Sequence, residues 1–345
     1  IIAKQNLIRR PRWLVINSGN ANAGTGERGL TNALETCSAL SGLTGGKTEQ
    51  VMPFSTGVIG EQLPVEKIIR VLPDAIANLS ENNWHSAARA IMTTDTFAKG
   101  VSKKVKIKNE TVTITGISKG AGMIQPNMAT MLAFIATDAR IEASLLQQRL
   151  QEVVDTSFNL ITVDGDTSTN DACVLMASGH SNAPEIIENS PYFFEFCNAL
   201  ESVCSSLAEA IVRDGEGATK FIRIVVEQAK DDNEAVNVGK TIAHSPLVKT
   251  AFFASDPNWG RILAAVGRSG LDNLDLDKVA IYLGNVCIVR HGGRAEEYTE
   301  QAGQQIMDRD EITVTVSLGR GSAEQQVLTC DFSYDYVRIN AEYRT

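Results

Sequence analysis

Lys119-Gly-Ala-Gly-Met-Ile-Gln-Pro-Asn-Met-Ala-Thr-Met-Leu-Ala-Phe134 is the stretch that decides the fold of this chain. A loop rich in Gly, Pro and Asn leads to Thr130, and residues 130–137 are almost uninterruptedly apolar, as in a strand covered on both faces. The small Ala129 leaves space for the Thr130 hydroxyl to attack the preceding carbonyl carbon. The stretch predicts a central strand starting at Thr130 and self-cleavage between Ala129 and Thr130.

The chemistry of Thr130 depends on that cleavage. A threonine hydroxyl is a poor nucleophile without a base, and the amine of a chain beginning at Thr130 would supply one. Such an α-amine has a pKa of about 7.7 to 8.0, so it can accept and return a proton near neutrality. The local sequence alone also fits an ordinary threonine that starts a strand after a turn, and this alternative stays open here.

The composition narrows the class of protein. The chain has 345 residues, 43% of them hydrophobic, and a net charge of -9 without a basic block, which argues against a nucleic-acid partner. No apolar run reaches the roughly 18 to 20 residues of a membrane span. The opening Ile1-Ile-Ala-Lys-Gln5 lacks the layout of a signal peptide. We therefore predict a globular, cytoplasmic protein with neither a nucleic-acid nor a membrane partner.

Cysteine and histidine spacing gives no metal site. The six cysteines form no CxxC pair, so we expect reduced core residues. None of the four histidines lies four residues from another or beside a cysteine. The sequence therefore predicts no metal ion.

Hydrophobic periodicity predicts mixed strands and helices. A hairpin is expected around Asn109-Glu110, where apolar and polar residues alternate on both sides. Strands are expected at 13–16, 50–54, 130–137, 172–178, 219–227, 279–289, 311–318 and 325–333. Helices are expected at 28–42, 64–79, 143–157, 191–212, 233–243, 261–268 and 295–305. Because the two types do not alternate regularly, the pattern favours an α+β layered architecture.

Several long motifs resemble one family in matching order, from about residue 13 to the C-terminus. They are Asn17–Ala23, Ser55–Gly60, Met92–Thr96, Lys119–Phe134, Val163–Asp171, Arg213–Thr219 and Asp256–Arg261. Together they closely resemble the ornithine acetyltransferases, also called glutamate N-acetyltransferases, of arginine biosynthesis. The resemblance implies an αββα-type, N-terminal-nucleophile-like sandwich with mixed sheets and the active site between the layers.

The resemblance also implies a reaction and an assembly. Residues 1–129 would form an alpha chain, and residues 130–345 a beta chain starting at the nucleophile and including a C-terminal α/β lobe from about 233. Acetyl would pass from N2-acetyl-L-ornithine to Thr130 and then to L-glutamate in a ping-pong mechanism. The two chains would pair as an α2β2 heterotetramer. No cofactor is expected, acetyl-CoA as a second donor stays open, and relatives carry several tens of residues before the Trp13 strand.

The resemblance also implies roles for individual residues of this sequence. Thr56 and Gly57 resemble the family's oxyanion pair, because a hydroxyl and an unhindered backbone N–H can stabilise a developing oxyanion. Lys119 and Thr96 match substrate-binding positions, and a cation beside hydroxyl donors suits an α-carboxylate. Glu216 matches an acidic residue that faces a substrate ammonium or assists proton transfer.

The chain end and two turns complete the predicted site. Asn340 and Thr345 match the family's closing pattern, in which both reach the substrate, although by sequence alone this tail is expected to be disordered. Asp164 and its neighbours lack the glycine and glutamate offsets of a calcium loop, so we expect a hydrogen-bonded turn beneath the active site. Asp256–Arg261 is expected to be a rigid turn that supports the pocket.

Two other functions remain in view. The same nucleophile would serve an N-terminal-nucleophile amidase or aminopeptidase, which passes the acyl group to water and so releases acetate without glutamate. Residues 19–29, rich in glycine, could alternatively cradle phosphate in a nucleotide-binding module. No GxxxxGK[ST] motif is present, which weighs against this last interpretation.

Overall fold

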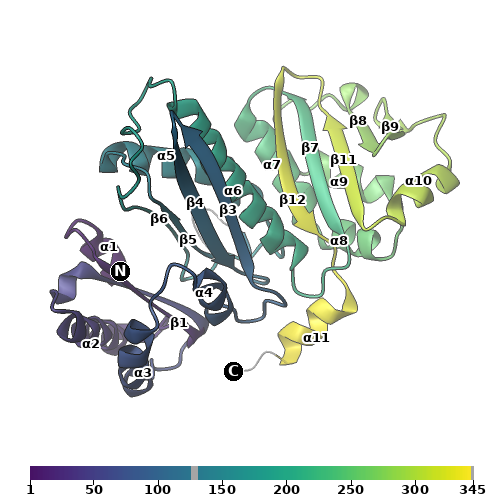
Figure 1. Ribbon diagram of the computed structural model, residues 1–345. Coiled ribbons are helices and arrows are strands. Elements are labelled where there is room, and N and C mark those ends of the chain that lie inside the picture. Colours follow the sequence, from purple (N-terminus) through teal and green to yellow (C-terminus); the bar gives the residue numbers. More distant parts are fainter. Residues whose placement is uncertain (126–130, 343–345) are drawn as a thin grey trace.

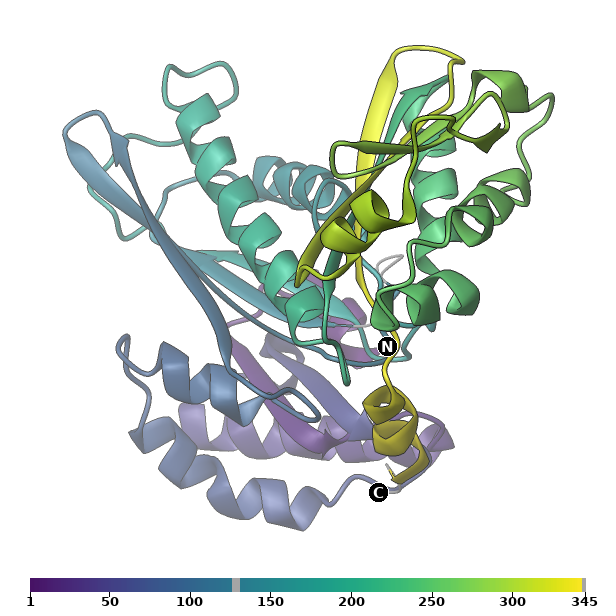
Figure 2. The same cartoon turned by 90° about the vertical axis from the view of Figure 1, so that its right-hand side faces the viewer.

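The structure is a computed structural model that describes residues 1–125 and 131–342. Predictions that fall on Ala129, Thr130 and Thr345 lie outside these residues. The described chain forms a four-layered first part and a C-terminal lobe, which stand side by side in two perpendicular views (Figure 1, Figure 2).

The first two layers come from the N-terminal residues. Two parallel strands, β1 (Trp13–Asn20) and β2 (Val51–Val58), form a small sheet. Helices α2 (Gly26–Thr44) and α3 (Val65–Ala77) cover one face of it through Cys37, Leu40 and Leu72. The shorter elements here are α1 (Ile2–Leu7), the 3-10 turn Thr48–Gln50 and α4 (Trp84–Ala90).

The central sheet forms the third layer. Its order is β3 (Lys99–Ile107), β4 (Glu110–Lys119), β5 (Leu132–Thr137) and β6 (Ala172–Ala177). The first three strands are antiparallel, and β6 is parallel to β5. The sheet packs on β2 through Phe54 and Phe134, whose rings meet edge to face with centroids 5.2 Å apart.

Two helices form the fourth layer and complete the αββα order that the family resemblance implies. Helices α5 (Ala143–Asp155) and α6 (Phe193–Arg213) cover the other face of the central sheet. At Gly116 of β4 a Cβ would lie 2.9 Å from Leu207 of α6, so the helix packs directly on the strand backbone. The 3-10 turn Phe158–Leu160 follows α5. The α+β layered fold class is therefore confirmed.

The C-terminal lobe is built around a second mixed sheet. Its strand order is β10-β9-β8-β11-β7-β12, and α7 and α9 pack against it around an apolar core that includes Ile224, Val238 and Val314. The elements in chain order are β7 (Phe221–Ala229), α7 (Asp232–Ala243), α8 (Pro246–Phe253), α9 (Trp259–Gly267), the 3-10 turn Leu276–Lys278, β8 (Ala280–Leu283), β9 (Val286–Arg290), β10 (Gly293–Arg294), α10 (Glu300–Met307), β11 (Glu311–Ser317) and β12 (Ala323–Cys330).

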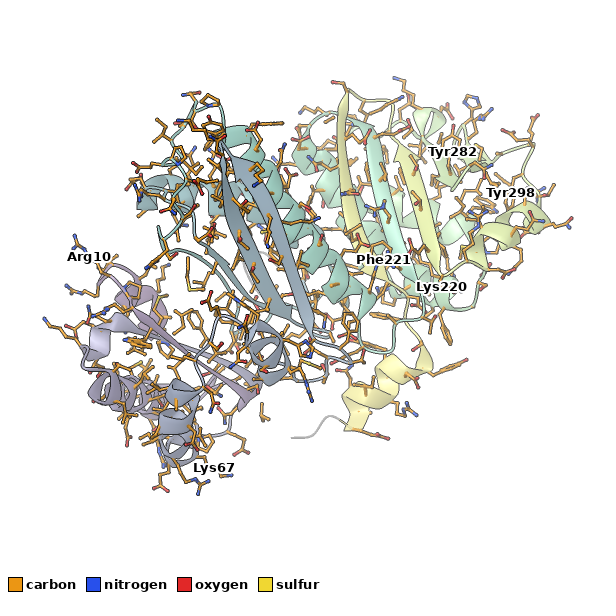
Figure 3. The ribbon with its side chains drawn as sticks, viewed as in Figure 1. Arg10, Lys67, Lys220, Phe221, Tyr282 and Tyr298 are labelled. Carbon is orange, nitrogen blue, oxygen red and sulfur yellow. The ribbon has the colours of Figure 1, made fainter. Side chains whose placement is uncertain are left out.

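Asp331 fixes the junction between the two parts. Its carboxylate accepts hydrogen bonds from the backbone N–H groups of Thr219 and Lys220, both at 2.8 Å, and from the Thr219 hydroxyl at 2.6 Å. Lys220 and Phe221 mark this point at the start of β7 (Figure 3). Beyond it, helix α11 (Tyr334–Glu342) turns back from the lobe towards the first part (Figure 1).

Three sequence predictions need correction. The single strand expected at 279–289 is a hairpin, because Gly284 and Asn285 turn the chain between β8 and β9. The tail expected to be disordered is helical as far as Glu342. Ser55, Thr56 and Gly57 lie within β2 and not after its end, since β1 pairs with β2 as far as Val58.

Candidate active site

The predicted site residues meet in one pocket of the first part. Thr56, Gly57, Lys119, Glu216 and Asn340 all line it, although they come from β2, β4, the turn after α6 and α11. Residues that the sequence analysis did not single out for chemistry also line it: Thr93, Thr94, Gly122, Met131, Asn170 and Asp171. The pocket lies at the end of β4 and the start of β5, where the chain enters and leaves the predicted nucleophile loop.

Lys119 is the buried cation of the pocket. Its side chain is 8% exposed, and its Nζ donates to the hydroxyl oxygens of Thr56 at 3.1 Å and Thr93 at 2.9 Å. Burial lowers the pKa of Lys119 from its ordinary value, and the charge of Asp95 partly offsets this. Because an ammonium only donates, both threonine oxygens are acceptors here. In the described part of the chain neither hydroxyl donates to another residue, so both hydrogens can be offered to a ligand.

Gly57 lets the two N-terminal strands meet closely beside Thr56. Its φ is +128°, and a Cβ would lie 2.4 Å from the carbonyl carbon of Gly19 on β1. Only glycine fits this backbone without displacing β1. The result is a bare stretch of backbone next to a buried hydroxyl, at the wall of the pocket.

Glu216 lies directly against the predicted nucleophile loop. A Cβ on Gly122 would be 2.3 Å from its carboxyl carbon, and the Glu216 N–H donates to the Ala121 carbonyl at 2.8 Å. Its Oε2 accepts a hydrogen bond from Nδ2 of Asn340 at 2.7 Å. A side chain of helix α11 therefore hydrogen-bonds to a carboxylate on the other side of the pocket.

A buried ion cluster supports this arrangement from behind. Lys99 donates to Asp95 at 2.6 Å and also to Asp214, and all three side chains are almost fully buried. Asp95 also accepts the Gly120 N–H at 2.7 Å. Burial by itself raises the pKa of Asp95, but the charge of Lys99, the Gly120 N–H and the charge of Lys119 lower it overall. The cluster links the residues beside Lys119 to Asp214, two residues before Glu216.

Thr96 occupies a different environment from the one its predicted role requires. Its N–H and hydroxyl both donate to Asp214, and it is not among the residues that line the pocket. Thr93, three residues earlier, carries the hydroxyl that bonds Lys119. The substrate-binding role of Thr96 stays a prediction, while the geometry gives Thr93 the position of a pocket donor.

Asp164 has the supporting role that the sequence analysis expected for its turn. Its carboxylate accepts the N–H groups of Met123 at 2.6 Å and Ile124 at 2.9 Å. The Thr162 hydroxyl and the Val163 N–H bond the Ile124 carbonyl at 2.8 Å each. The turn thus holds the loop that leads to residue 126 by its backbone.

The two remaining motifs lie elsewhere. Asp256–Arg261 begins α9 in the C-terminal lobe, where the Asn258 side chain accepts the Arg261 N–H at 3.1 Å; it is not among the pocket residues. In the glycine-rich loop after β1, Asn20 and Asn22 use their side chains on the loop itself: Asn20 accepts the Asn22 N–H, and Asn22 donates to the Gly29 carbonyl. These contacts give the loop a structural role.

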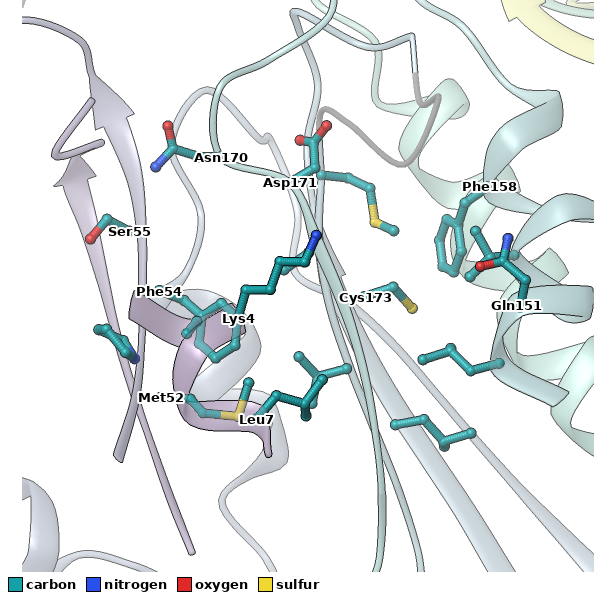
Figure 4. Close-up of a pocket in the computed structure, with 18 of the residues that line it drawn as sticks. Lys4, Leu7, Met52, Phe54, Ser55, Gln151, Phe158, Asn170, Asp171 and Cys173 are labelled. Atoms are coloured by element: carbon teal, nitrogen blue, oxygen red, sulfur yellow. The ribbon is translucent and has the colours of Figure 1, made fainter. Parts of the chain in front are cut away.

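A larger, mostly apolar hollow adjoins the pocket (Figure 4). It lies between α1, β2, α5 and β6, and it shares Met131, Thr169, Asn170 and Asp171 with the pocket. Asp171 therefore stands in the wall between the two spaces.

A buried lysine that orients two hydroxyls, a close-packed glycine and a carboxylate form a site suited to binding a small acid and stabilising an oxyanion. Together with the layered α+β fold, this defines a small-molecule acyltransferase. The chain matches the model of the ArgJ family over residues 1–345, and it belongs to that family.

Individual relatives support the assignment. The chain is 63% identical over 344 residues to the arginine biosynthesis bifunctional protein ArgJ of Methylococcus capsulatus, covering 100% of this chain and 84% of the relative. It is 54% identical over 346 residues to the protein of that name from Pseudomonas syringae, covering 85% of the relative. The crystal structure of the Bacillus halodurans arginine biosynthesis bifunctional protein argJ matches with a TM-score of 0.59 and 41% identity, covering 61% of this chain and 99% of that one.

The family resemblance and the enzyme class that the sequence predicts are thereby confirmed, and the chain is an acyltransferase of arginine biosynthesis. Like its family, it acts on small molecules. In the part of the chain that the structure describes, no helix combines the length and the apolar character needed to cross a membrane.

Proposed function

We propose that this enzyme transfers the acetyl group of N2-acetyl-L-ornithine to L-glutamate through an acetyl ester on Thr130, after cleaving its own chain between Ala129 and Thr130. The observation that carries the proposal is the pair of hydroxyls held by Lys119, at the point where the chain leaves for Thr130. Glu216, packed on Gly122 of the same loop, adds a carboxylate.

The oxyanion of acyl transfer would form beside Thr56 and Gly57. Lys119 occupies an acceptor lone pair of the Thr56 oxygen and turns the hydroxyl hydrogen away from itself, towards the pocket. A hydroxyl fixed in this way needs no reorganisation when negative charge develops, which is why pre-oriented donors commonly contribute about 3 to 4 kcal/mol. The Gly57 N–H is proposed as the second donor.

Charges in the pocket match an amino-acid substrate. The α-carboxylate would lie against Lys119 and the Thr93 hydroxyl, since a cation and a pre-oriented donor together bind carboxylates well. Glu216, fixed by Asn340, would face the substrate ammonium or assist proton transfer. The predicted contacts from Thr96 and Thr345 stay proposals. No cofactor is needed, because Thr130 would supply both the nucleophile and, once cleaved, the base.

Intact mass combined with product analysis tests the proposal. The active enzyme should run as two fragments, residues 1–129 and 130–345, and Thr130→Ala should give one uncut chain without activity. Thr250→Ala, an exposed threonine of α8, is the matched control and should cleave and react normally. A fully active enzyme with an unbroken Ala129–Thr130 bond would exclude the mechanism.

The same product analysis identifies the acceptor and the donor of the acetyl group. Stoichiometric N-acetylglutamate from N-acetylornithine and glutamate supports transferase activity, whereas acetate released without glutamate would identify the amidase. N-acetylglutamate from acetyl-CoA and glutamate would identify acetyl-CoA as a second donor. Native mass spectrometry tests the α2β2 heterotetramer, which rests on the family resemblance, and the cytoplasmic location stays a prediction.

A further inference from the structure

Asp171 is a charged residue of the pocket to which the proposed mechanism gives no role. Its carboxylate accepts the backbone N–H of Met131. The next residue, Ala172, donates its N–H to the Met131 carbonyl at 3.0 Å, beside the β5–β6 pairing. The Asn170 side chain donates to the Ala21 carbonyl at 2.5 Å and so ties the start of β6 to the N-terminal sheet. Asp171 is therefore presented to the pocket from a fixed backbone.

The carboxyl group of Asp171 retains bonding capacity. The residue lines the pocket and is partly exposed, while its Oδ2 is buried and has no hydrogen-bond partner in the described part of the chain. Glu216, which lines the same pocket, already accepts a bond from Asn340. Because rotation about the Cβ–Cγ bond exchanges the two carboxyl oxygens, a ligand can bind one oxygen of Asp171 while the Met131 N–H keeps the other. A ligand group that pairs with the free oxygen removes the cost of leaving it unpartnered.

The proposed reaction brings two substrates of opposite side-chain charge to this pocket. N2-acetylornithine and glutamate react at the same acyl carbon, so both would place the α-nitrogen beside Thr56 and Gly57 and the α-carboxylate on Lys119. The same number of bonds separates Cα from the terminal nitrogen of ornithine and from the terminal oxygens of glutamate. One position in the pocket would thus receive an ammonium in the first half of the reaction and a carboxylate in the second.

A group of fixed charge does not suit both substrates at that position. A permanent carboxylate would repel the glutamate side chain, whereas a permanently neutral group would leave the ornithine ammonium without a counter-charge in a partly desolvated site. A carboxyl group that titrates near neutral pH meets both needs, as an acceptor when ionised and as a donor when protonated. Burial raises the pKa of Asp171 to about 8, although the charge of Lys119 and the Met131 N–H lower it.

We propose that Asp171 binds the side-chain end of both substrates: the ionised carboxylate accepts hydrogen bonds from the δ-ammonium of ornithine, and the neutral acid donates to the γ-carboxylate of glutamate. The inference rests on the proposed function and goes beyond it by assigning a residue to the substrate side chains. Glu216 is then left for the α-amino group. Glutamate takes up one proton from solvent when it binds the ionised form, and ornithine releases one when it binds the protonated form. No other bond of Asp171 forms or breaks.

The charges that face Asp171 come from other elements. Lys119 of β4 lowers its pKa, Glu216 lies in the same pocket after α6, and Lys4 of α1 extends towards it in the adjoining hollow (Figure 4). Burial lowers the pKa of Lys119, whereas the charges of Asp171 and Glu216 raise it. A substrate α-carboxylate bound to Lys119 would therefore have both carboxyl groups in its surroundings, as a compact amino acid with a second charge requires.

Equilibrium binding of L-ornithine and L-glutamate to the cleaved enzyme tests the proposal, because neither reacts without an acetyl donor. Isothermal titration calorimetry gives the ratio of the two dissociation constants, in which the contributions of the shared α-groups largely cancel. In wild-type enzyme the Kd of ornithine divided by that of glutamate should fall about tenfold or more between pH 6.5 and 9. The reason is that Asp171 ionises in this range while both ligand side chains keep their charge.

Asp171→Asn imitates the neutral acid at every pH, because its amide accepts the Met131 N–H and donates to a carboxylate. Its ratio should stay near the wild-type value at pH 6.5, with ornithine bound about tenfold more weakly than by wild type at pH 9. Asp272→Asn, at an exposed aspartate of the C-terminal lobe, is the matched control and should keep the wild-type profile.

The outcomes are distinguishable. A wild-type ratio that does not change with pH overturns the inference, whether or not Asp171→Asn folds. A pH-dependent ratio that Asp171→Asn retains also overturns it, and loss of that dependence in Glu216→Gln alone would assign the side chain to Glu216 instead. The proposed function fails separately, if the enzyme shows no fragments 1–129 and 130–345 or if no acetyl reaches glutamate.

Discussion

The two parts of the molecule each bury a lysine, but they use it differently. Lys119 in the first part donates to two hydroxyls whose own hydrogens stay free to bind a ligand. Lys249 in the C-terminal lobe, 1% exposed, donates to the Thr329 hydroxyl at 2.9 Å and to the Cys330 carbonyl, and its ammonium lies 4.5 Å from the centre of the Phe332 ring. Lys249 links α8 to β12, whereas Lys119 prepares donors for a substrate.

The comparison shows how a buried charge can be assigned a role. Around Lys119 the neighbouring buried groups still have bonding capacity, namely the hydroxyls of Thr56 and Thr93 and one oxygen of Asp171. Around Lys249 the contacts are backbone, hydroxyl and ring groups of its own lobe, and none of these residues lines the pocket. Bonding capacity that faces a pocket therefore indicates function, and contacts made within a core indicate structure.

Substituting each of the two lysines tests this comparison most directly and should give the largest effect. Lys119→Met should reduce kcat/KM by about 10³-fold, because it removes the cation that binds the substrate carboxylate and no longer orients the two threonine hydroxyls. Lys249→Met is the matched variant and should change thermal stability while the folded enzyme keeps its kcat. Steady-state kinetics and thermal unfolding of both variants check this; equal activity losses would show that the two lysines do not differ in role.

Phe252→Ala tests the lobe's apolar core. Phe252 is 1% exposed in α8, so its truncation should lower the free energy of unfolding by about 3 kcal/mol or more. The kcat of the folded fraction should stay within twofold, since this residue does not line the pocket. Urea unfolding with active-site titration measures both. A large fall in kcat per folded molecule would show that the lobe controls the chemistry.

Thr56→Ala tests the proposed oxyanion donor. Loss of its oriented hydroxyl should lower kcat by about 10²-fold with little change in KM, because the donor acts on charge that develops in the transition state. Thr56→Ser keeps the hydroxyl and should recover most of the rate. A serine variant as slow as the alanine variant would instead point to the lost methyl group.

Asn340→Ala tests the contribution of α11. Removing its hydrogen bond to Glu216 should cost about 1.4 kcal/mol, a tenfold change in kcat/KM, since the bond joins a buried charged group to an exposed amide. Asn237→Ala, which loses a side-chain bond to the Ser269 carbonyl in the lobe, is the control and should keep full activity. Steady-state kinetics of both variants measures the difference.

The smallest effect concerns acid stability of the lobe. Burial, with the charges of Lys240, Lys249 and Arg268, lowers the pKa of His244 to about 4. The unfolded chain binds this proton near the ordinary pKa of 6.5, so stability should fall as the pH drops from about 6.5 to 4. Unfolding at pH 7 and 5.5 should show a loss of about 1 kcal/mol that His244→Gln removes.

Sequence patterns predicted the elements that have clear periodicity. The alternation on both sides of Asn109 gave the β3–β4 hairpin, and long apolar faces gave α2, α5 and α6. Short helices such as α4 and α8 were missed, because seven or eight residues carry little periodic signal. The apolar run 279–289 hid a turn, since the two residues between β8 and β9 interrupt it only briefly.

The sequence predicted which residues form the candidate site better than it predicted how they are arranged. Family motifs identified Thr56, Lys119 and Glu216, which the structure brings to one pocket. Among three closely spaced threonines, however, sequence could not show which hydroxyl reaches Lys119; only the packing distinguishes Thr93 from Thr96. Long-range contacts such as Asn340 to Glu216 leave no local pattern, so the tail helix was not expected.

The central sheet has one more consequence. Its strands β3 and β4 precede the proposed scission point and β5 and β6 follow it, with β4 paired to β5 from Ile114 to Lys119. The two fragments would thus remain bound to each other through the backbone hydrogen bonds between β4 and β5 and through a shared apolar core. Two genes encoding the halves separately should therefore complement each other and reconstitute one particle, with no covalent link between the pieces.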